Sequence, residues 1–186
     1  MNAGILSPGS AVAGRRGVSQ LVTAQMITST TTWVAPGTGY VALLLFGAGG
    51  SGACVQISGA GAPRVTGGGA GGTCFRLFPV VRGQSYTITI GAGGAARVLG
   101  APGSLAGLAG GDTSCIGPGV SMFALGGQGG TLSTVDGTAM TGSLGGGAIG
   151  GDYMLQGGAS GSISSVTLAA PLCSGGGSPS VWPGNT

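Results

Sequence analysis

Side chains that could take part in chemistry are few in this sequence, and the usual catalytic types are missing. It has no His, Lys or Glu, and its charges come from six Arg and three Asp, for a net charge of +3. General bases, catalytic triads and most metal sites draw on the missing residue types. The remaining candidates are the carboxylates of Asp112, Asp136 and Asp152, the four cysteines and the tyrosines. We therefore expect a non-enzymatic protein with no catalytic residue, metal or cofactor.

Two of the carboxylates share a local context, because Asp112 and Asp152 each follow two glycines. A pair of carboxylates in a groove could hydrolyse host glycans, as in a depolymerase. Calcium requires many oxygen ligands, and three Asp are too few for a calcium-binding array. An Asp that follows two glycines commonly bonds to the backbone of its own turn. We favour this structural role for both residues.

The four cysteines, Cys54, Cys74, Cys115 and Cys173, lie far apart and form no C-x-x-C pair. A zinc site is disfavoured, since zinc ligands usually come in closely spaced pairs. Four cysteines allow three disulfide pairings, and the sequence does not choose among them. The alternative is that they are small, buried apolar residues. Both interpretations remain open.

Glycine dominates the composition, with 46 of 186 residues, whereas only 5% of the residues are charged and 42% are hydrophobic. The tracts lack the three-residue period of collagen, and the apolar runs between them argue against disorder. The charges are too few for nucleic-acid binding. We expect no signal peptide and no membrane insertion, because the apolar run at residues 40–46 is far shorter than the ~20 residues of a membrane span.

The elements that must position any site look like β-strands. Residues 40–46 (YVALLLF) are a short apolar run bounded by glycine, which predicts a buried strand. Residues 85–90 (SYTITI) alternate between apolar and hydroxyl side chains, the pattern of a half-buried strand. Together with residues 73–81 and a turn at residues 82–84, they predict a β-hairpin.

The glycine tracts allow two structures. Extended glycine adopts the polyproline-II geometry, and bundled helices of this kind can exchange N–H···O=C and Cα–H···O contacts. Alternatively, the tracts are loops of a β-sandwich. Dense packing or oligomerisation should offset the entropy cost of ordering so much glycine. The predicted fold is all-β: a glycine-rich β-sandwich-like module (residues 28–186) with polyglycine-II-type tracts and essentially no α-helix, preceded by an N-terminal arm (residues 1–27).

Several blocks resemble the glycine-rich domain of bacteriophage tail-fibre and related virion surface proteins. Residues 33–37 (WVAPG), the strand at 40–46 and Gly-Ala-Gly-Gly at 47–50 resemble its opening. Residues 71–75 and 81–94 resemble its second block, residues 111–114 and 150–159 its later blocks, and residues 174–182 its ending. The blocks keep the family's order over residues 28–182. The arm and the four cysteines depart from the family's pattern. The chain is also similar to tail-tip adhesins with stacked polyglycine-II helices, whose loops between tracts contact the host receptor.

This resemblance implies a non-enzymatic virion structural protein on the external surface of a phage particle, in the tail rather than the capsid. It would be an exposed tail-fibre or tail-tip module that binds a host cell-surface receptor, either a glycan or an outer-membrane protein. The protein would be a homo-oligomer, and fibre symmetry suggests a trimer. The arm would bind other virion proteins. The residues we assign to virion anchoring are Arg15, Arg16, Leu21 and Val22.

Exposed aromatic and methionine side chains are candidate receptor contacts, because such anchors often dominate recognition. We expect Trp33 to lie in the core. The possible contact residues on tract-linking loops are Tyr153, Met154, Met122 and Trp182.

Three alternatives remain. A capsid head fibre or decoration protein would share the fold and have a purely structural role. A cellular glycine-rich structural or ice-binding protein would show regular threonine or alanine faces, which the spacing here does not. The glycan depolymerase would need two of the three carboxylates in one groove.

Overall fold

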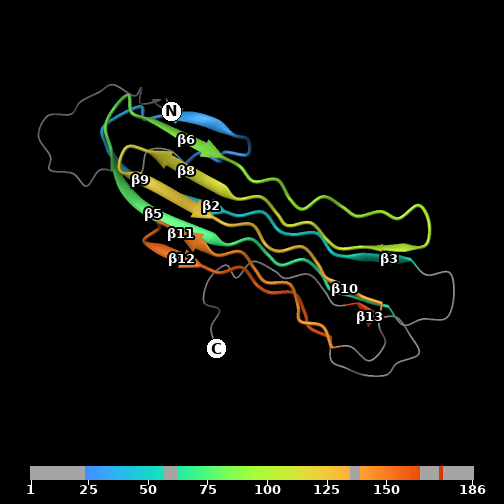
Figure 1. The fold of residues 1–186 in the computed structure, drawn as a ribbon. Helices are drawn as coiled ribbons and strands as arrows, with labels where there is room; N and C mark the ends of the chain where they lie inside the picture. Colours follow the sequence, from blue (N-terminus) through green and yellow to red (C-terminus); the bar gives the residue numbers. More distant parts are fainter. Residues whose placement is uncertain (1–23, 57–62, 135–138, 164–171, 174–186) are drawn as a thin grey trace, which may run out of the picture.

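The computed structural model describes residues 24–56, 63–134, 139–163 and 172–173, and these contain strands but no helix (Figure 1). The expected all-β fold is therefore confirmed for the described residues. The strands are β1 (Thr31–Val34), β2 (Gly39–Phe46), β3 (Cys54–Gln56), β4 (Arg64–Val65), β5 (Thr73–Val80), β6 (Ser85–Thr89), β7 (Gly103–Leu105), β8 (Thr113–Gly117), β9 (Val120–Ala124), β10 (Leu132–Ser133), β11 (Ala148–Ile149), β12 (Tyr153–Leu155) and β13 (Leu172–Cys173).

Two sheets form a β-sandwich at one end of the molecule. The five-stranded sheet has the order β1-β6-β8-β9-β11, and the three-stranded sheet has the order β12-β5-β2. Their inner faces make the core. The ring of Phe78 on β5 lies 5.6 Å from that of Tyr86 on β6, which in turn lies 5.6 Å from the partly buried ring of Trp33. The other core residues are Ala35, Leu45, Cys74, Val80, Ile88, Cys115, Val120, Met122 and Ala124.

The predicted hairpin between residues 73–81 and 85–90 is wrong. The turn exists, with Gly83 at φ 84° and a backbone bond from Gln84 N to Val81 O of 3.0 Å. However, β5 pairs with β2 and β12, whereas β6 pairs with β1 and β8. The turn therefore links the two layers of the sandwich. This arrangement buries the apolar face of each strand between the sheets instead of pairing the two strands edge to edge.

The glycine tracts continue from the strands and run together away from the sandwich (Figure 1). Gly47 N and Gly50 N donate to carbonyls of residues 66–72, at 2.8 and 2.9 Å. Ala48 N and Ser51 N donate instead to carbonyls of residues 106–111, at 3.1 and 2.9 Å. N–H groups three residues apart thus donate to the same neighbouring tract, as expected for a helix with three residues per turn. The tracts therefore form a polyglycine-II bundle, and the loop interpretation does not hold for them.

Glycine is required in the bundle because backbones touch where a side chain would begin. A Cβ added at Gly50 would overlap the carbonyl of Gln128, and one added at Gly127 would overlap that of Gly69. Each overlap is with backbone and cannot be relieved by a rotamer change. The hydrogen-bonded tracts are residues 47–53, 66–72, 91–94, 107–111, 125–131, 142–147 and 157–160.

Short strand pairs and side-chain hydroxyl groups lie at the end of the bundle away from the sandwich. There β3 pairs with β7, and β4 lies between β10 and β13. The buried Thr66 hydroxyl lies 3.1 Å from Oγ1 of Thr131 and 3.3 Å from Oγ of Ser143. Ser143 Oγ in turn donates to Gly129 O at 2.8 Å. These hydroxyl groups thus add side-chain bonds between the tracts, next to the backbone pairing of β4 with β10.

Candidate binding surfaces

Three of the predicted receptor contacts lie in the described residues, and two of them are exposed. Tyr153 and Met154 lie on β12 and are 50% and 51% exposed, so both are accessible, although on a strand rather than a loop. Met122 lies on β9 and is completely buried. Placing Met122 on an exposed loop was wrong, since its side chain fills the core between the sheets.

The remaining predicted site residues lie outside the described residues. They are the anchoring residues Arg15, Arg16, Leu21 and Val22, the contact residue Trp182 and the candidate carboxylate Asp136. The predicted arm, residues 1–27, is described only from residue 24 onward.

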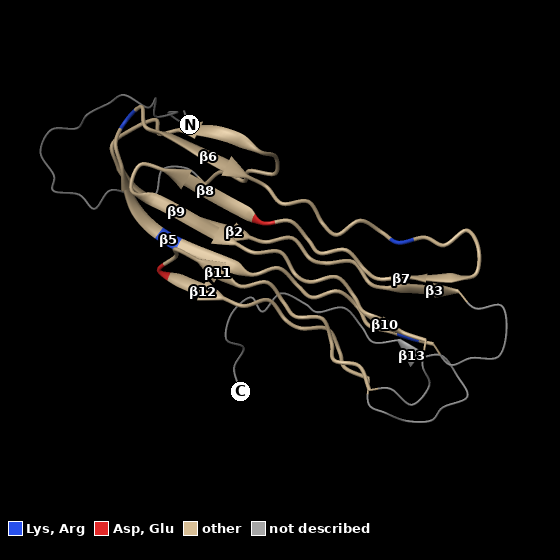
Figure 2. Cartoon of the chain, viewed as in Figure 1, with Lys and Arg blue, Asp and Glu red and all other residues tan. Residues whose placement is uncertain are grey.

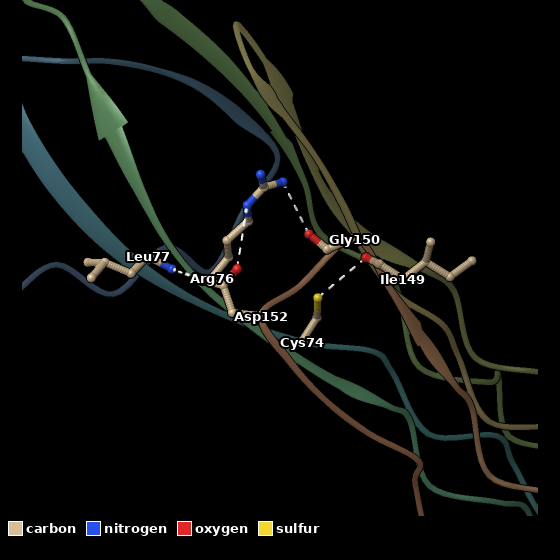
Figure 3. Close-up of polar contacts among 6 residues, drawn as sticks. All are labelled: Cys74, Arg76, Leu77, Ile149, Gly150 and Asp152. Carbon is tan, nitrogen blue, oxygen red and sulfur yellow. Dashed lines mark hydrogen bonds and ion pairs between the residues drawn. The ribbon is translucent and has the colours of Figure 1, made fainter.

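In the two Gly-Gly-Asp segments, the Asp side chain accepts a hydrogen bond from the backbone of another segment. Asp112 Oδ1 accepts a bond from Gly126 N at 2.8 Å, and Asp152 Oδ2 accepts one from Leu77 N at 2.8 Å. Figure 3 shows Asp152 beside Arg76, whose Nε lies 4.0 Å from Oδ1 of Asp152. The expected bond to the local turn was wrong, because the partners lie 14 and 75 residues away in sequence. Asp112 precedes β8 and Asp152 precedes β12, so the two carboxylates serve different sheets.

Three cysteines, Cys54, Cys74 and Cys115, are free thiols in the structure, and the latter two are buried in the core. Burial raises the pKa of the Cys115 thiol to about 11 and also raises the pKa of Cys74. Cys74 Sγ donates to Ile149 O at 3.4 Å (Figure 3). Within the described ranges, no three residues of metal-ligating type form a group. Of the two interpretations left open, Cys74 and Cys115 therefore fit that of buried apolar residues.

The outward side of the three-stranded sheet is apolar across all three strands, and we call it the apolar outer face. One row across it is Tyr153, Phe75 and Leu44, and the next pairs Leu77 with Ala42. Its other members are Tyr40, Phe46, Pro79 and Leu155. The exposed fractions are high: 75% for Tyr40, 49% for Phe46, 48% for Leu44 and 54% for Leu77.

The outward side of the five-stranded sheet differs in chemistry. Hydroxyl side chains occupy most of its positions and separate apolar residues such as Ile116. These exposed hydroxyl residues are Thr32, Ser85, Thr87, Thr89 and Ser121. The two sides of the sandwich therefore present different surfaces to the solvent.

A groove of about 400 Å³ borders the apolar outer face at the end of the sandwich away from the bundle. Its apolar lining includes Leu77, Pro79 and Val81 together with the Pro118–Gly119 turn. Its polar groups belong to Gln84, Arg76 and Asp152. The carboxylate and the guanidinium are already engaged with backbone atoms, so the groove's polar groups have a structural role.

Sequence reasoning missed the apolar outer face because it placed residues 40–46 in a strand buried on both sides. Only Leu45 of β2 is buried, and its alternate residues face the solvent. A signal was present: the sequence offers too few other apolar strands to cover both sides of this run.

Charged residues are sparse over the described part of the chain and form no cluster on either sheet (Figure 2). The described residues also include no apolar helix of membrane-spanning length.

No curated protein matches this chain. A family of glycine-rich domains matches residues 25–186, which include every strand of the sandwich and every tract of the bundle. The chain therefore belongs to this glycine-rich domain family.

Proposed function

We propose that this protein is a non-enzymatic structural module on the external surface of a bacteriophage particle, in a tail fibre or tail tip, where it binds a host receptor. The observation that carries the proposal is the polyglycine-II bundle, which extends from the sandwich and ends in short pairings and loops (Figure 1). A projecting bundle of this kind suits the presentation of loops at a distance from an anchoring end.

The bundle's bonding supports a mechanical role. Its tracts are joined sideways by backbone bonds in several directions; for example, Gly127 N donates to Ala48 O at 2.9 Å and Gly69 N donates to Gln128 O at 2.8 Å. Because these bonds connect segments far apart in the sequence, bending the bundle would strain many of them together. A stiff module with few charged side chains fits display better than catalysis.

The positions of the carboxylates support a non-enzymatic role. Asp112 and Asp152 each hold the backbone of a neighbouring segment, which favours structural use over general acid–base chemistry. The depolymerase alternative would require one of them to leave its backbone partner.

Receptor contact in this proposal uses the loops at the far end of the bundle together with exposed side chains outside the apolar outer face, such as Met154. Val98, in the loop before β7, is 82% exposed. The N-terminal arm would bind other virion proteins, and copies of the chain would associate with one another.

Localisation in purified particles tests this proposal. Mass spectrometry should detect the chain in intact particles, and gold-labelled antibodies should bind the outside of the tail. Label on the capsid surface would replace the tail assignment by a head-fibre or decoration role. Absence from particles, or protection inside the capsid, would refute the virion-surface function.

Receptor binding is tested separately by adsorption. Particles carrying Met154→Ala, or a shortened loop around Val98, should adsorb more slowly to host cells. Ser121→Ala, an exposed change on the five-stranded sheet, is the control. Adsorption that none of these changes reduces would contradict a receptor-binding role for these regions.

A further inference from the structure

We infer that the apolar outer face of the three-stranded sheet binds the same face of a second copy of this chain about a twofold axis. The inference deepens the proposed function, which includes self-association, by naming the surface and the partner. The location of the protein in a particle and its oligomeric state are measured by separate experiments, so the proposed function and the inferred dimer can each be refuted without the other.

The first argument is the exposed area. A fully exposed aromatic side chain contributes roughly 200 Å². With three aromatic residues between 49% and 75% exposed and two leucines near 50%, the face offers on the order of 500 Å² from these side chains alone. Monomeric proteins rarely expose a larger contiguous apolar patch. Two such faces together reach about 1,000 Å², the area that a specific interface needs.

The second argument is the charge and chemistry of the face. None of its members is charged, and Asp152, at its β12 edge, already bonds to Leu77 N. Interfaces of obligate homodimers are more apolar than those of transient complexes. A permanent partner of equal polarity therefore fits this face better than a hydrated glycan does.

The third argument is shape. The face is the side of a small antiparallel sheet with β5 at its centre, and two such sheets can pack face to face with nearly aligned strands. Ala42 lies between the larger Tyr40 and Leu44 along β2. A twofold axis would let bulky residues of one copy enter this low point of the other. A face that binds itself in this way closes as a dimer and does not generate a trimer.

Sedimentation equilibrium of the full-length chain tests the inference directly. The wild type should sediment as a dimer at micromolar concentration. Leu44→Asp should weaken association at least tenfold, because it buries a charge within the interface. Ile116→Asp is the matched control, since Ile116 is an equally exposed strand residue (49% against 48%) on the opposite sheet. A monomeric wild type, including one whose own terminal segments cover the face, would overturn the inference.

Cross-linking keeps the test decisive if Leu44→Asp fails to fold. Under mild oxidation, Leu77→Cys on the central strand β5, close to the proposed twofold axis, should give a covalent dimer, and Ser121→Cys on the other sheet should give only the wild-type background. Equal cross-linking of both variants, a trimeric mass, or dissociation by Ile116→Asp but not by Leu44→Asp would each refute the proposed face.

Discussion

Adjacent glycines in the bundle should respond oppositely to the same substitution. Gly49 and Gly50 lie side by side in the same tract. A Cβ at Gly50 would overlap the Gln128 carbonyl, whereas one at Gly49 would find its nearest neighbour, Gly69 O, at an ordinary 3.7 Å. We therefore expect Gly50→Ala to destabilise the fold and Gly49→Ala to leave it intact.

The magnitude follows from the bonds that a displaced tract would lose. Relieving the overlap would move residues 47–53 away from residues 125–131, which are joined by Gly127 N to Ala48 O at 2.9 Å and Gly130 N to Ser51 O at 2.8 Å. Each lost bond costs about 1 kcal/mol, and overpacking typically costs 1–3 kcal/mol if the overlap persists. The expected loss in the free energy of unfolding is roughly 2–4 kcal/mol.

Gly49→Ala should instead stabilise by about 0.4–1 kcal/mol, because alanine restricts the unfolded chain. Thermal unfolding followed by circular dichroism measures both changes. For a chain of this size each kcal/mol shifts Tm by about 2–4 °C, so Gly50→Ala should lower Tm by roughly 4–16 °C. Equal melting temperatures for the two variants, or a lower one for Gly49→Ala, would refute the bundle geometry.

Three further predictions concern single contacts. Gln84→Ala should lower the free energy of unfolding by about 1–3 kcal/mol, because Gln84 Oε1 accepts bonds from the core Tyr86 hydroxyl at 3.0 Å and from the Val81 N–H at 2.8 Å. Denaturant unfolding measures this change, and the exposed control Gln128→Ala should change the free energy by less than about 0.5 kcal/mol. Asp112→Ala should cost about 1 kcal/mol by losing the bond from Gly126 N, and Asp112→Asn should recover part of this in the same assay. Burial raises the pKa of the Cys115 thiol from 9.0 in the unfolded chain to about 11 in the fold. The neutral buried thiol therefore contributes its full stabilisation below pH 9.0, and this stabilisation is lost as the pH rises toward 11. Between about pH 8 and pH 10.5, the free energy of unfolding of the wild type should fall by about 2 kcal/mol more than that of Cys115→Ala. The same pH dependence in both proteins would contradict the burial of this thiol.

The local strand pattern was predictable where alternation is strong. In β6, Tyr86 and Ile88 are buried and Thr87 and Thr89 are exposed, as the alternation of residues 85–90 indicates. Pairing was not predictable from that pattern, because alternation fixes which side is apolar but not which strand lies alongside. The tight hairpin joins β8 to β9 through Pro118 and Gly119, with Gly119 at φ 70°. Proline followed by glycine suits such a turn.

The candidate surface was partly predictable. Tyr153 and Met154 are exposed, as expected, whereas Met122, which like Met154 lies in a short strand beside an aromatic residue, is buried in the core. Exposure depends on which sheet covers a strand, and that is a long-range property.

By itself, the sequence determined the all-β class, the lack of ordinary catalytic residues and the membership of a glycine-rich family. Composition and local alternation carry these properties. Only the tertiary structure decided that the glycine tracts form a bundle and that residues 40–46 expose one side. Both depend on neighbours distant in the chain: a tract becomes a polyglycine-II helix when other carbonyls meet its N–H groups, and a strand is buried only on the side that a second sheet covers.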